Sequence, residues 1–322
     1  MKPLTKRKPL PERVRVGSIL ATRTGVKATA DFWARERSKT LALEGGREFL
    51  HQSVEPATSV NIPGIGKNDK VFFFAGSVGS VSRWIPKGVH IHSDVDPAAV
   101  RIARERYEKV RAKVKRHFLV ADATRLPINK VDWLFSHEPL FMTSLAGKDT
   151  PPVGPMGKLL VPQAVSRARK GIILTASTEM NWEVNQLKDF LKWITSVYSP
   201  GKKIGHETVS VSPYHHVKPL GVLTLRVTPG MRRKARVDER VIMELERFEK
   251  KAVKDGKLKP IVDEIRPGTL KWTPMEVPDK TLLSRTFDLS QQDLAALGKG
   301  LKLSRLELSA SITRLRKLHF LK

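Results

Sequence analysis

Cysteine is absent from the 322-residue sequence, which excludes disulfides, thiolate metal ligands and cysteine nucleophiles. Long apolar runs are absent as well, because no stretch of about 18 apolar residues is available to cross a bilayer as a helix. We therefore expect a soluble protein with no membrane partner, whose chemistry is carried by histidine and carboxylate side chains.

Acidic residues are also few: the sequence has 32 Asp and Glu but 59 Lys and Arg, which gives a formal net charge of +27. A protein with this charge repels copies of itself and attracts polyanions. Nucleic acid is the predicted partner, with RNA favoured over DNA. The cytoplasm is the expected location, with an organelle as the alternative, and the oligomeric state stays open.

Changes of composition divide the chain into four predicted segments. Residues 1–60 form a basic N-terminal tail and a helix, and residues 61–229 form the main α/β domain. A charged helical linker at 230–280 follows, and two helical patterns make a small C-terminal domain at 281–322. The helix of the linker carries its apolar residues in a Lys- and Glu-rich background, which indicates an exposed linking helix.

The first 30 residues contain eight Lys or Arg and a single acid, Glu12. An organellar presequence would need an amphipathic helix, which Pro3, Pro9 and Pro11 oppose. The favoured interpretation is a basic tail that lies along phosphates.

The main domain alternates short apolar runs with helical patterns, which predicts a mostly parallel α/β sheet. The predicted strands lie at 71–74, 89–94, 117–120, 131–135 and 171–174. Two further strands, 207–212 and 221–227, are separated by a loop too short for a crossover helix. These last two strands are therefore predicted to be antiparallel neighbours.

The ends of the first two strands carry the strongest functional signal. The first enters a small-residue loop with Gly76 and Gly79, and the second ends in Asp94. In an open α/β sheet, ligands bind beyond the carboxyl ends of the strands, where glycines admit a ligand to the backbone and an acid takes a ribose diol. A purely structural turn is the alternative. Asp96 is interpreted as an acid at a helix N-terminus.

On these residues the main domain resembles a class I S-adenosylmethionine-dependent methyltransferase. The resemblance implies a Rossmann-like sheet of seven strands, with the run from Phe74 to Ser80 as the glycine loop. It also implies S-adenosylmethionine as cofactor. The implied cofactor-binding residues are Ala75, Gly76, Ser77, Gly79, Asp94, Val95, Asp122 and Ala123. The antiparallel last strand disfavours an NAD-binding domain.

The fourth strand runs into the segment from Ser136 to Phe141, where methyltransferases of this class place their substrate-facing motif. The resemblance implies that His137 or Glu138 accepts a hydrogen from a target amino group, that Pro139 makes a rigid turn and that Phe141 stacks on the base. Positioning would then supply most of the rate. In the alternative interpretation, His137 and Glu138 only cap the strand at a polar edge of the sheet and have no role in catalysis. More narrowly, the domain is similar to ribosomal RNA adenine dimethyltransferases and their mitochondrial transcription-factor relatives in its second and third strands, in the segment from His137 to Phe141 and in the run from Val209 to Pro229.

The C-terminal segment is similar to a winged-helix or helix-turn-helix reader. Its helical pattern at 308–318 has a small, polar and basic outward face, and Arg314, Arg316 and Lys317 are the predicted nucleic-acid contacts. A helical cap on the main domain has the same leucine spacing and is the alternative. Ser290 is the predicted cap of the first helix.

No metal site is predicted. His215 and His216 are neighbours in a loop, but no second group of ligands stands nearby in the sequence. We interpret both as solvent-exposed or as stacking on RNA.

Three functions remain open at this point. The first is methylation of a base in RNA. The second is a catalytically eroded methyltransferase fold that serves as a structural or assembly factor, because Phe74 stands where the family usually has an acid and Val78 or Ser80 where it usually has glycine. The third is a transcription regulator that binds duplex DNA through residues 281–322.

Overall fold

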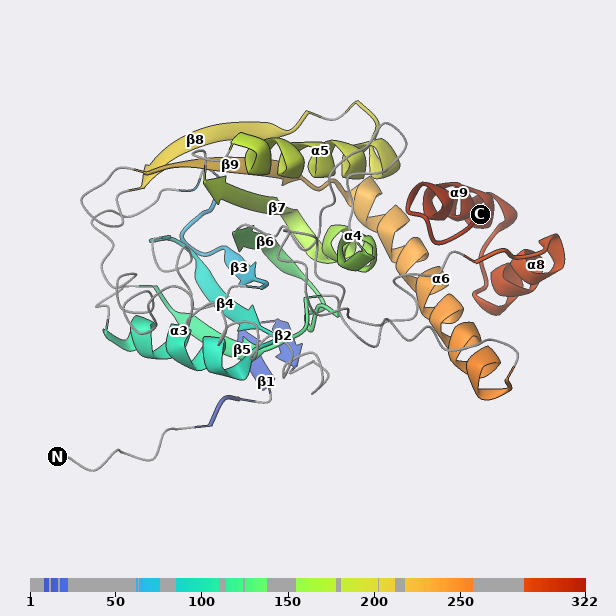
Figure 1. The fold of residues 1–322 in the computed structure, drawn as a ribbon, viewed down its shortest axis with the longest axis horizontal. Coiled ribbons are helices and arrows are strands. Elements are labelled where there is room, and N and C mark those ends of the chain that lie inside the picture. Colours follow the sequence, from blue (N-terminus) through green and yellow to red (C-terminus); the bar gives the residue numbers. More distant parts are fainter. Residues whose placement is uncertain are drawn as a thin grey trace, which may run out of the picture. The chain divides into compact units, whose positions relative to one another are not determined.

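The computed structural model describes 9–11, 13–16, 18–22, 62, 64–75, 85–109, 114–123, 125–137, 155–177, 181–201, 203–211, 218–256 and 287–322 (Figure 1). Two compact units make up the chain: Met1–His137 with Thr208–Leu220, and Glu138–Glu207 with Gly221–Lys322. We name them unit 1 and unit 2. No helix within the described ranges is long and apolar enough to cross a membrane. The four segments predicted from composition stay predictions.

Unit 1 contains four parallel strands and a crossover helix. The elements are β3 (Lys70–Phe73), β4 (Val89–Asp94), α3 (Pro97–Lys109), β5 (Arg116–Val120) and β6 (Val131–His137). β3 pairs in parallel with both β4 and β6, and β4 pairs in parallel with β5. This confirms the predicted mostly parallel α/β sheet.

The central position of β3 explains its sequence. Val71, Phe72 and Phe73 are all buried, as expected for a parallel strand that is covered on both faces. The crossover helix α3 begins where the Asp96 carboxylate accepts a hydrogen bond from the Ala98 amide at 2.8 Å, so Asp96 lies at the helix N-terminus as predicted.

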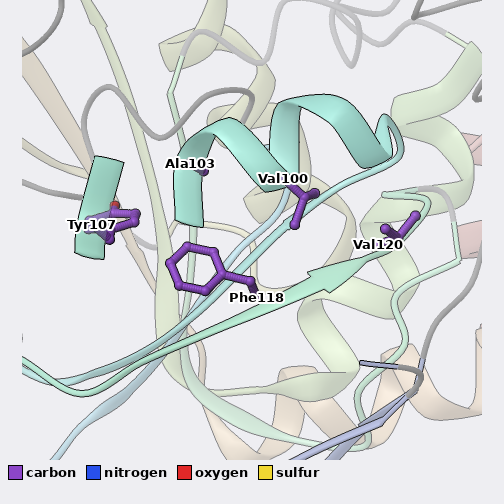
Figure 2. Packing of buried hydrophobic residues seen from close by; sticks show 5 residues of the cluster. All are labelled: Val100, Ala103, Tyr107, Phe118 and Val120. Carbon is purple, nitrogen blue, oxygen red and sulfur yellow. The ribbon is translucent and has the colours of Figure 1, made fainter. Parts of the chain in front are cut away.

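The apolar stripe of α3 packs against the adjacent strand β5, and Figure 2 shows the contact. Val100, Ala103 and Tyr107 follow one another at helical spacing and meet Phe118 and Val120 of β5. This buried cluster holds α3 on the sheet and thereby fixes the turn between β4 and α3.

The N-terminal residues 13–22 are not the extended tail that the charge predicted. They form an antiparallel hairpin of β1 (Arg13–Val16) and β2 (Ile19–Thr22). Basic and apolar residues alternate along β1, so Arg13 and Arg15 are exposed while the residues between and after them are buried. The buried residues of the hairpin include Val14, Val16, Ile19 and Ala21. The helix predicted after this hairpin falls outside the described residues.

Unit 2 is mainly helical. Its elements are α4 (Pro155–Arg167), β7 (Ala168–Ser177), α5 (Asn181–Tyr198), α6 (Pro229–Lys254), α8 (Gln291–Gly300) and α9 (Arg305–Lys317). The remaining strands, β8 (Gly205–Val211) and β9 (Lys218–Arg226), each have residues in both units. Hydrogen bonding orders the larger sheet β5-β4-β3-β6-β7-β9-β8. β8 and β9 are neighbours, as the short loop between them predicted.

α6 is not the exposed linking helix that its composition indicated. It packs against α4, α5 and α9, and it buries a stripe of residues at spacings of three and four. The buried residues of this stripe are Met231, Ala235, Asp238, Val241, Ile242, Leu245 and Glu249. Two acids thus lie within the stripe, where charge would normally mark a solvent-exposed face.

Candidate functional site

The predicted cofactor site falls at the carboxyl ends of β3, β4 and β5, all within unit 1. β3 leaves the sheet after Phe74, whose amide donates to the Phe135 carbonyl at 3.1 Å. The next residue, Ala75, has φ 47°, in the left-handed region that residues with a side chain rarely adopt. The chain therefore turns sharply where the small-residue loop was predicted to begin. Gly76, Ser77 and Gly79 lie outside the described residues.

Two buried hydroxyl groups fix the point at which β3 ends. The Ser93 Oγ of β4 donates to the Phe73 carbonyl at 2.8 Å, and the Ser136 Oγ of β6 donates to the Phe74 carbonyl at 3.0 Å. Both serines are buried, and their hydroxyls reach carbonyls at the last positions of the strand. The neighbouring strands hold the start of the loop from both sides.

Sequence reasoning missed these two serines. The available signal was a single serine near the end of each strand, before Asp94 in β4 and before His137 in β6. Their role became visible only through the pairing of both strands with β3, which the sequence does not specify.

Asp94 ends β4, as predicted. Its carboxylate Oδ1 accepts the Asp96 amide at 2.9 Å, and its backbone carbonyl accepts the Ala121 amide at 2.8 Å. The second of these bonds ties Asp94 to the turn that follows β5. Asp94 and Val95 are half-buried at this edge, so the carboxylate stands at the boundary between protein and solvent.

Asp122 lies in the turn that follows β5 and is 2% exposed. Its carbonyl accepts the Arg125 amide at 3.0 Å, which closes the turn. Ala121 and Ala123 on either side are buried, and neither carries a side chain beyond Cβ. The structure thus brings Asp94, Val95, Asp122 and Ala123 to one edge of unit 1 through the bond between the Asp94 carbonyl and the Ala121 amide.

Phe74 occupies the position where the resembled family usually has an acid. Its side chain is almost fully buried, so this position contributes apolar packing and no carboxylate. A cofactor bound at this edge would take its acidic partner from β4.

The predicted substrate-facing motif is described only at its start. His137 is the last residue of β6 and is half-buried. Phe135 pairs with Phe73, so His137 comes two residues later at the same sheet edge as Ala75. Glu138 and Phe141 lie outside the described residues, and their roles stay predictions.

β4 also carries two histidines that sequence reasoning did not single out. His90 and His92 are each 1% exposed and lie among aromatic rings: His90 contacts Phe73, and His92 contacts Tyr107 and Phe118. The His90 Nε2 donates to the Lys87 carbonyl at 2.8 Å. Burial lowers the pKa of His90 to about 3, so this ring is neutral at pH 7. His90 and His92 belong to the core, because β4 is buried on both faces from His90 to Ser93.

The three predicted nucleic-acid contacts of α9 have different surroundings. Arg314 is only 9% exposed, and its guanidinium donates to both carboxylate oxygens of Asp238, at 2.8 Å and 2.7 Å. Arg314 therefore serves the packing of α9 on α6, and we no longer propose it as a nucleic-acid contact. Arg316 and Lys317 are exposed, although the Arg316 Nε also donates to the Lys322 carbonyl at 2.7 Å.

Both C-terminal helices begin with a capping box. The Ser290 hydroxyl accepts the Asp293 amide and the Asp293 carboxylate accepts the Ser290 amide, which confirms the predicted cap. Ser304 and Glu307 make the same arrangement at the start of α9. Within the described ranges no group of three His, Asp or Glu is placed to hold a metal ion, and His215 and His216 lie outside those ranges.

No family model matches the sequence, and no curated protein matches it. Solved structures do resemble the chain. Magnesium protoporphyrin IX methyltransferase from Synechocystis PCC 6803, with bound S-adenosylhomocysteine, is 15% identical, with 49% of this chain and 74% of that chain covered and a TM-score of 0.34. TrmN from Thermus thermophilus is 17% identical, with 50% and 44% covered and a TM-score of 0.30.

A third similar structure is the tRNA (uracil-54, C5)-methyltransferase of Pyrococcus abyssi in complex with S-adenosyl-L-homocysteine. It is 13% identical, with 50% of this chain and 35% of that chain covered and a TM-score of 0.32. Likeness at this level is too low to assign a family or an activity to the chain.

Proposed function

We propose that the chain is an S-adenosylmethionine-dependent methyltransferase that acts on a base in nucleic acid, with RNA as the favoured polymer. One observation carries the proposal: β3 turns at Ala75 into a small-residue loop, while Asp94 and Asp122 follow the next two parallel strands at the same edge. Ligands of open α/β sheets bind at this edge. In the hydrogen-bonded strand order the last strand, β9, lies between β7 and β8.

The residues of this edge fit an adenosine-containing cofactor. A half-buried carboxylate such as that of Asp94 can accept hydrogen bonds from both hydroxyls of a ribose. Ala121 and Ala123 flank Asp122 without bulky side chains, which suits the close approach of a flat adenine ring. Bound S-adenosylmethionine would supply a methyl group on a sulfonium, which is already a strong electrophile.

The chain would contribute positioning more than proton transfer. An acceptor at His137 or Glu138 would take a hydrogen from the target amino group and so turn its nitrogen toward the methyl group, while Phe141 would stack on the base. The +27 charge supports a polyanionic substrate. Arg13 and Arg15 of the hairpin are exposed cations of the same unit.

Calorimetric titration with S-adenosylmethionine tests the cofactor assignment. We expect measurable binding to the full chain and at least a tenfold loss in Asp94→Ala, because the ribose would lose its acceptor. Asp189→Ala is the matched control, since it removes a carboxylate from an exposed ion pair on α5 and should bind normally. Absence of binding at millimolar cofactor would reject the proposal.

A second function is favoured by the buried Phe74. An apolar side chain at the family's acidic position is consistent with a fold that has lost its cofactor and acts as a structural or assembly factor on nucleic acid. Incubation with tritiated S-adenosylmethionine, total RNA and genomic DNA separates the two functions. Label transfer that disappears in Asp94→Ala excludes the second function, whereas tight nucleic-acid binding without cofactor binding supports it.

A further inference from the structure

The C-terminal helices α8 and α9 form a closely packed pair. A Cβ atom built on Gly298 would lie 2.6 Å from Leu308 Cδ2, so α8 and α9 cross where glycine permits close contact. The turn between them is short: the Leu303 amide donates to the Gly298 carbonyl at 2.9 Å, and Ser304 already caps α9. A parallel bridge between Phe287 and Leu321 joins the residues that flank the pair.

The two faces of α9 differ sharply. The inner face is held by Leu315 and Leu318 in the core and by the ion pair of Arg314 with Asp238. The outer face is solvent-exposed along the whole helix and includes Leu306, which is 83% exposed. The other exposed residues of this face are Ser309, Ala310, Thr313 and Lys317.

The pair of helices α8 and α9 carries more exposed cations than acids. The exposed basic residues of the helix pair are Lys299, Lys302, Arg305, Arg316 and Lys317. The two acids of α8 and α9 are both engaged in capping boxes: hydrogen bonds from Ser290 hold the pKa of Asp293 below its usual range, and those from Ser304 do so for Glu307. The carboxylate of Asp288, just before α8, forms an exposed ion pair with Lys322, with 3.5 Å between Oδ2 and Nζ. The carboxylates of Asp293 and Glu307 stay ionised, but five exposed cations against two acids leave the helix pair positively charged, which is complementary to a polyanion.

We propose that the outer face of α9 docks in the major groove of double-stranded DNA, with the surrounding cations on the phosphates. The major groove of B-form DNA is about 12 Å wide and admits an α-helix, whereas the A-form major groove of RNA is too narrow. Short side chains at Ser309, Ala310 and Thr313 let the helix approach base edges closely, and exposed Leu306 suits contact with a thymine methyl group.

This docking surface stands apart from the proposed methyl transfer, because α8 and α9 belong to unit 2 and contribute none of the residues assigned to the cofactor edge. Failure of cofactor binding would leave the docking surface unaffected. Failure of duplex binding would leave the cofactor edge unaffected.

Fluorescence anisotropy with a labelled 24-base-pair DNA duplex tests the proposal on the full chain. Ala310→Glu places a carboxylate at the centre of the outer face and should weaken binding at least tenfold. Met243→Glu adds the same charge at a 48% exposed position of α6 and should change binding less than twofold. Equal melting temperatures of both variants and the parent would show that the fold is retained. Binding unchanged by Ala310→Glu would overturn the proposal.

Salt dependence and a second polymer complete the test. Lys317→Ala should lower the slope of log affinity against log salt by about 1, as expected when one phosphate contact is removed. Binding of a duplex RNA of the same sequence should be insensitive to Ala310→Glu, because RNA would bind through the proposed methyltransferase edge and not through α9. Equal weakening of RNA and DNA binding by Ala310→Glu, or no binding of duplex DNA at low salt, would refute docking in a major groove.

Discussion

Each unit buries an ionisable side chain on a central element, His90 in unit 1 and Asp238 in unit 2, and the two are accommodated in opposite ways. Unit 1 keeps His90 neutral among aromatic rings, with its pKa lowered to about 3 by burial. Unit 2 buries full charges and pairs them: Asp238 accepts both hydrogen bonds of the Arg314 guanidinium, and Ser311 donates to the same carboxylate at 2.6 Å. The stability of unit 1 therefore requires that His90 stays unprotonated, whereas the stability of unit 2 requires both partners of the ion pair between Arg314 and Asp238.

The difference follows from the secondary structure. A strand inside a parallel sheet is covered on both faces, so a histidine there meets packed rings and backbone and has no room for a counter-ion. Residues on α6 project toward facing helices, where a long arginine from α9 can reach them. Even so, burial raises the pKa of the Asp238 carboxyl, while the hydrogen bonds from Arg314 oppose that shift. Burial and the charge of Asp238 raise the pKa of Tyr198 well above its usual range.

The largest expected effect comes from breaking the ion pair of unit 2. Asp238→Asn leaves the Arg314 guanidinium buried without an ionised partner, and we expect unfolding free energy to fall by about 3–5 kcal/mol. Urea denaturation of the parent and the variant measures this change in unfolding free energy. Glu244→Gln is the control, since it removes an acid from the exposed pair with Arg247 and should change stability by less than about 0.5 kcal/mol.

A double variant separates a lost charge partner from lost packing. Asp238→Leu combined with Arg314→Met replaces the pair by apolar side chains and should recover at least half of the stability lost in Asp238→Asn, because no buried charge remains. A loss below about 1 kcal/mol in Asp238→Asn would show that the pair is not what holds α9 on α6.

The next effect concerns the neutral histidine of unit 1. The unfolded chain protonates His90 near pH 6.5, while the folded state resists protonation down to about pH 3. The unfolded state therefore binds more protons in this window, and stability falls as the pH falls below 6.5. We expect His90 to contribute a loss of about 2 kcal/mol between pH 7 and pH 5, measured by urea unfolding followed by tryptophan fluorescence.

His90→Phe tests the assignment of this pH dependence. The variant keeps an aromatic ring beside Phe73 and removes the titrating group, so its stability should change less between pH 7 and pH 5 than that of the parent. His117 and His319 also have pKa values lowered by burial, so part of the acid sensitivity should remain. A parent and variant with the same pH dependence would contradict a role for His90.

Local patterns predicted the end of β4 and a helix cap better than they predicted the surroundings of basic residues. A strand pattern that ends in an acid is a local signal and located Asp94 at the end of β4, and the pattern of a helix start located the cap Ser290. The same local reasoning failed for residues 13–22, since eight basic residues in the first 30 outweighed the alternation of arginine and valine that specifies a hairpin.

Non-local contacts account for the other error. Arg314 and Asp238 are 76 residues apart in the sequence. Each lies in a helix rich in charged residues, and a charged residue in such a helix is normally predicted to face solvent. Burial of such a pair depends on how α9 packs on α6, which no single helical pattern encodes. For the same reason, the hydrogen bonds from Ser93 and Ser136 to the end of β3 could not be predicted from the sequence of β4 or of β6 alone.

A smaller effect on stability is expected within unit 2, where α8 and α9 cross at Gly298. Gly298→Ala places a Cβ 2.6 Å from Leu308 Cδ2, so the Leu308 side chain must shift, and this overpacking should offset the gain of about 1 kcal/mol in helix propensity. Gly300→Ala, two residues later, has no atom within 4 Å of its new Cβ and should not destabilise the protein. Thermal melting of the two variants measures the contrast. Equal effects at both positions would show that helix propensity, not the crossing, decides.

The smallest expected effect concerns Lys302, which has φ 54° in the turn between α8 and α9. A side chain in this conformation is strained, so Lys302→Gly should stabilise the protein by about 0.5–1 kcal/mol while it removes a cation beside the docking face. Lys302→Ala removes the same charge and retains the strain. If the lysine serves DNA binding, both variants should weaken duplex binding several-fold, and only the glycine variant should melt at a higher temperature. A glycine variant that is more stable and binds DNA as tightly as the parent would remove Lys302 from the docking surface.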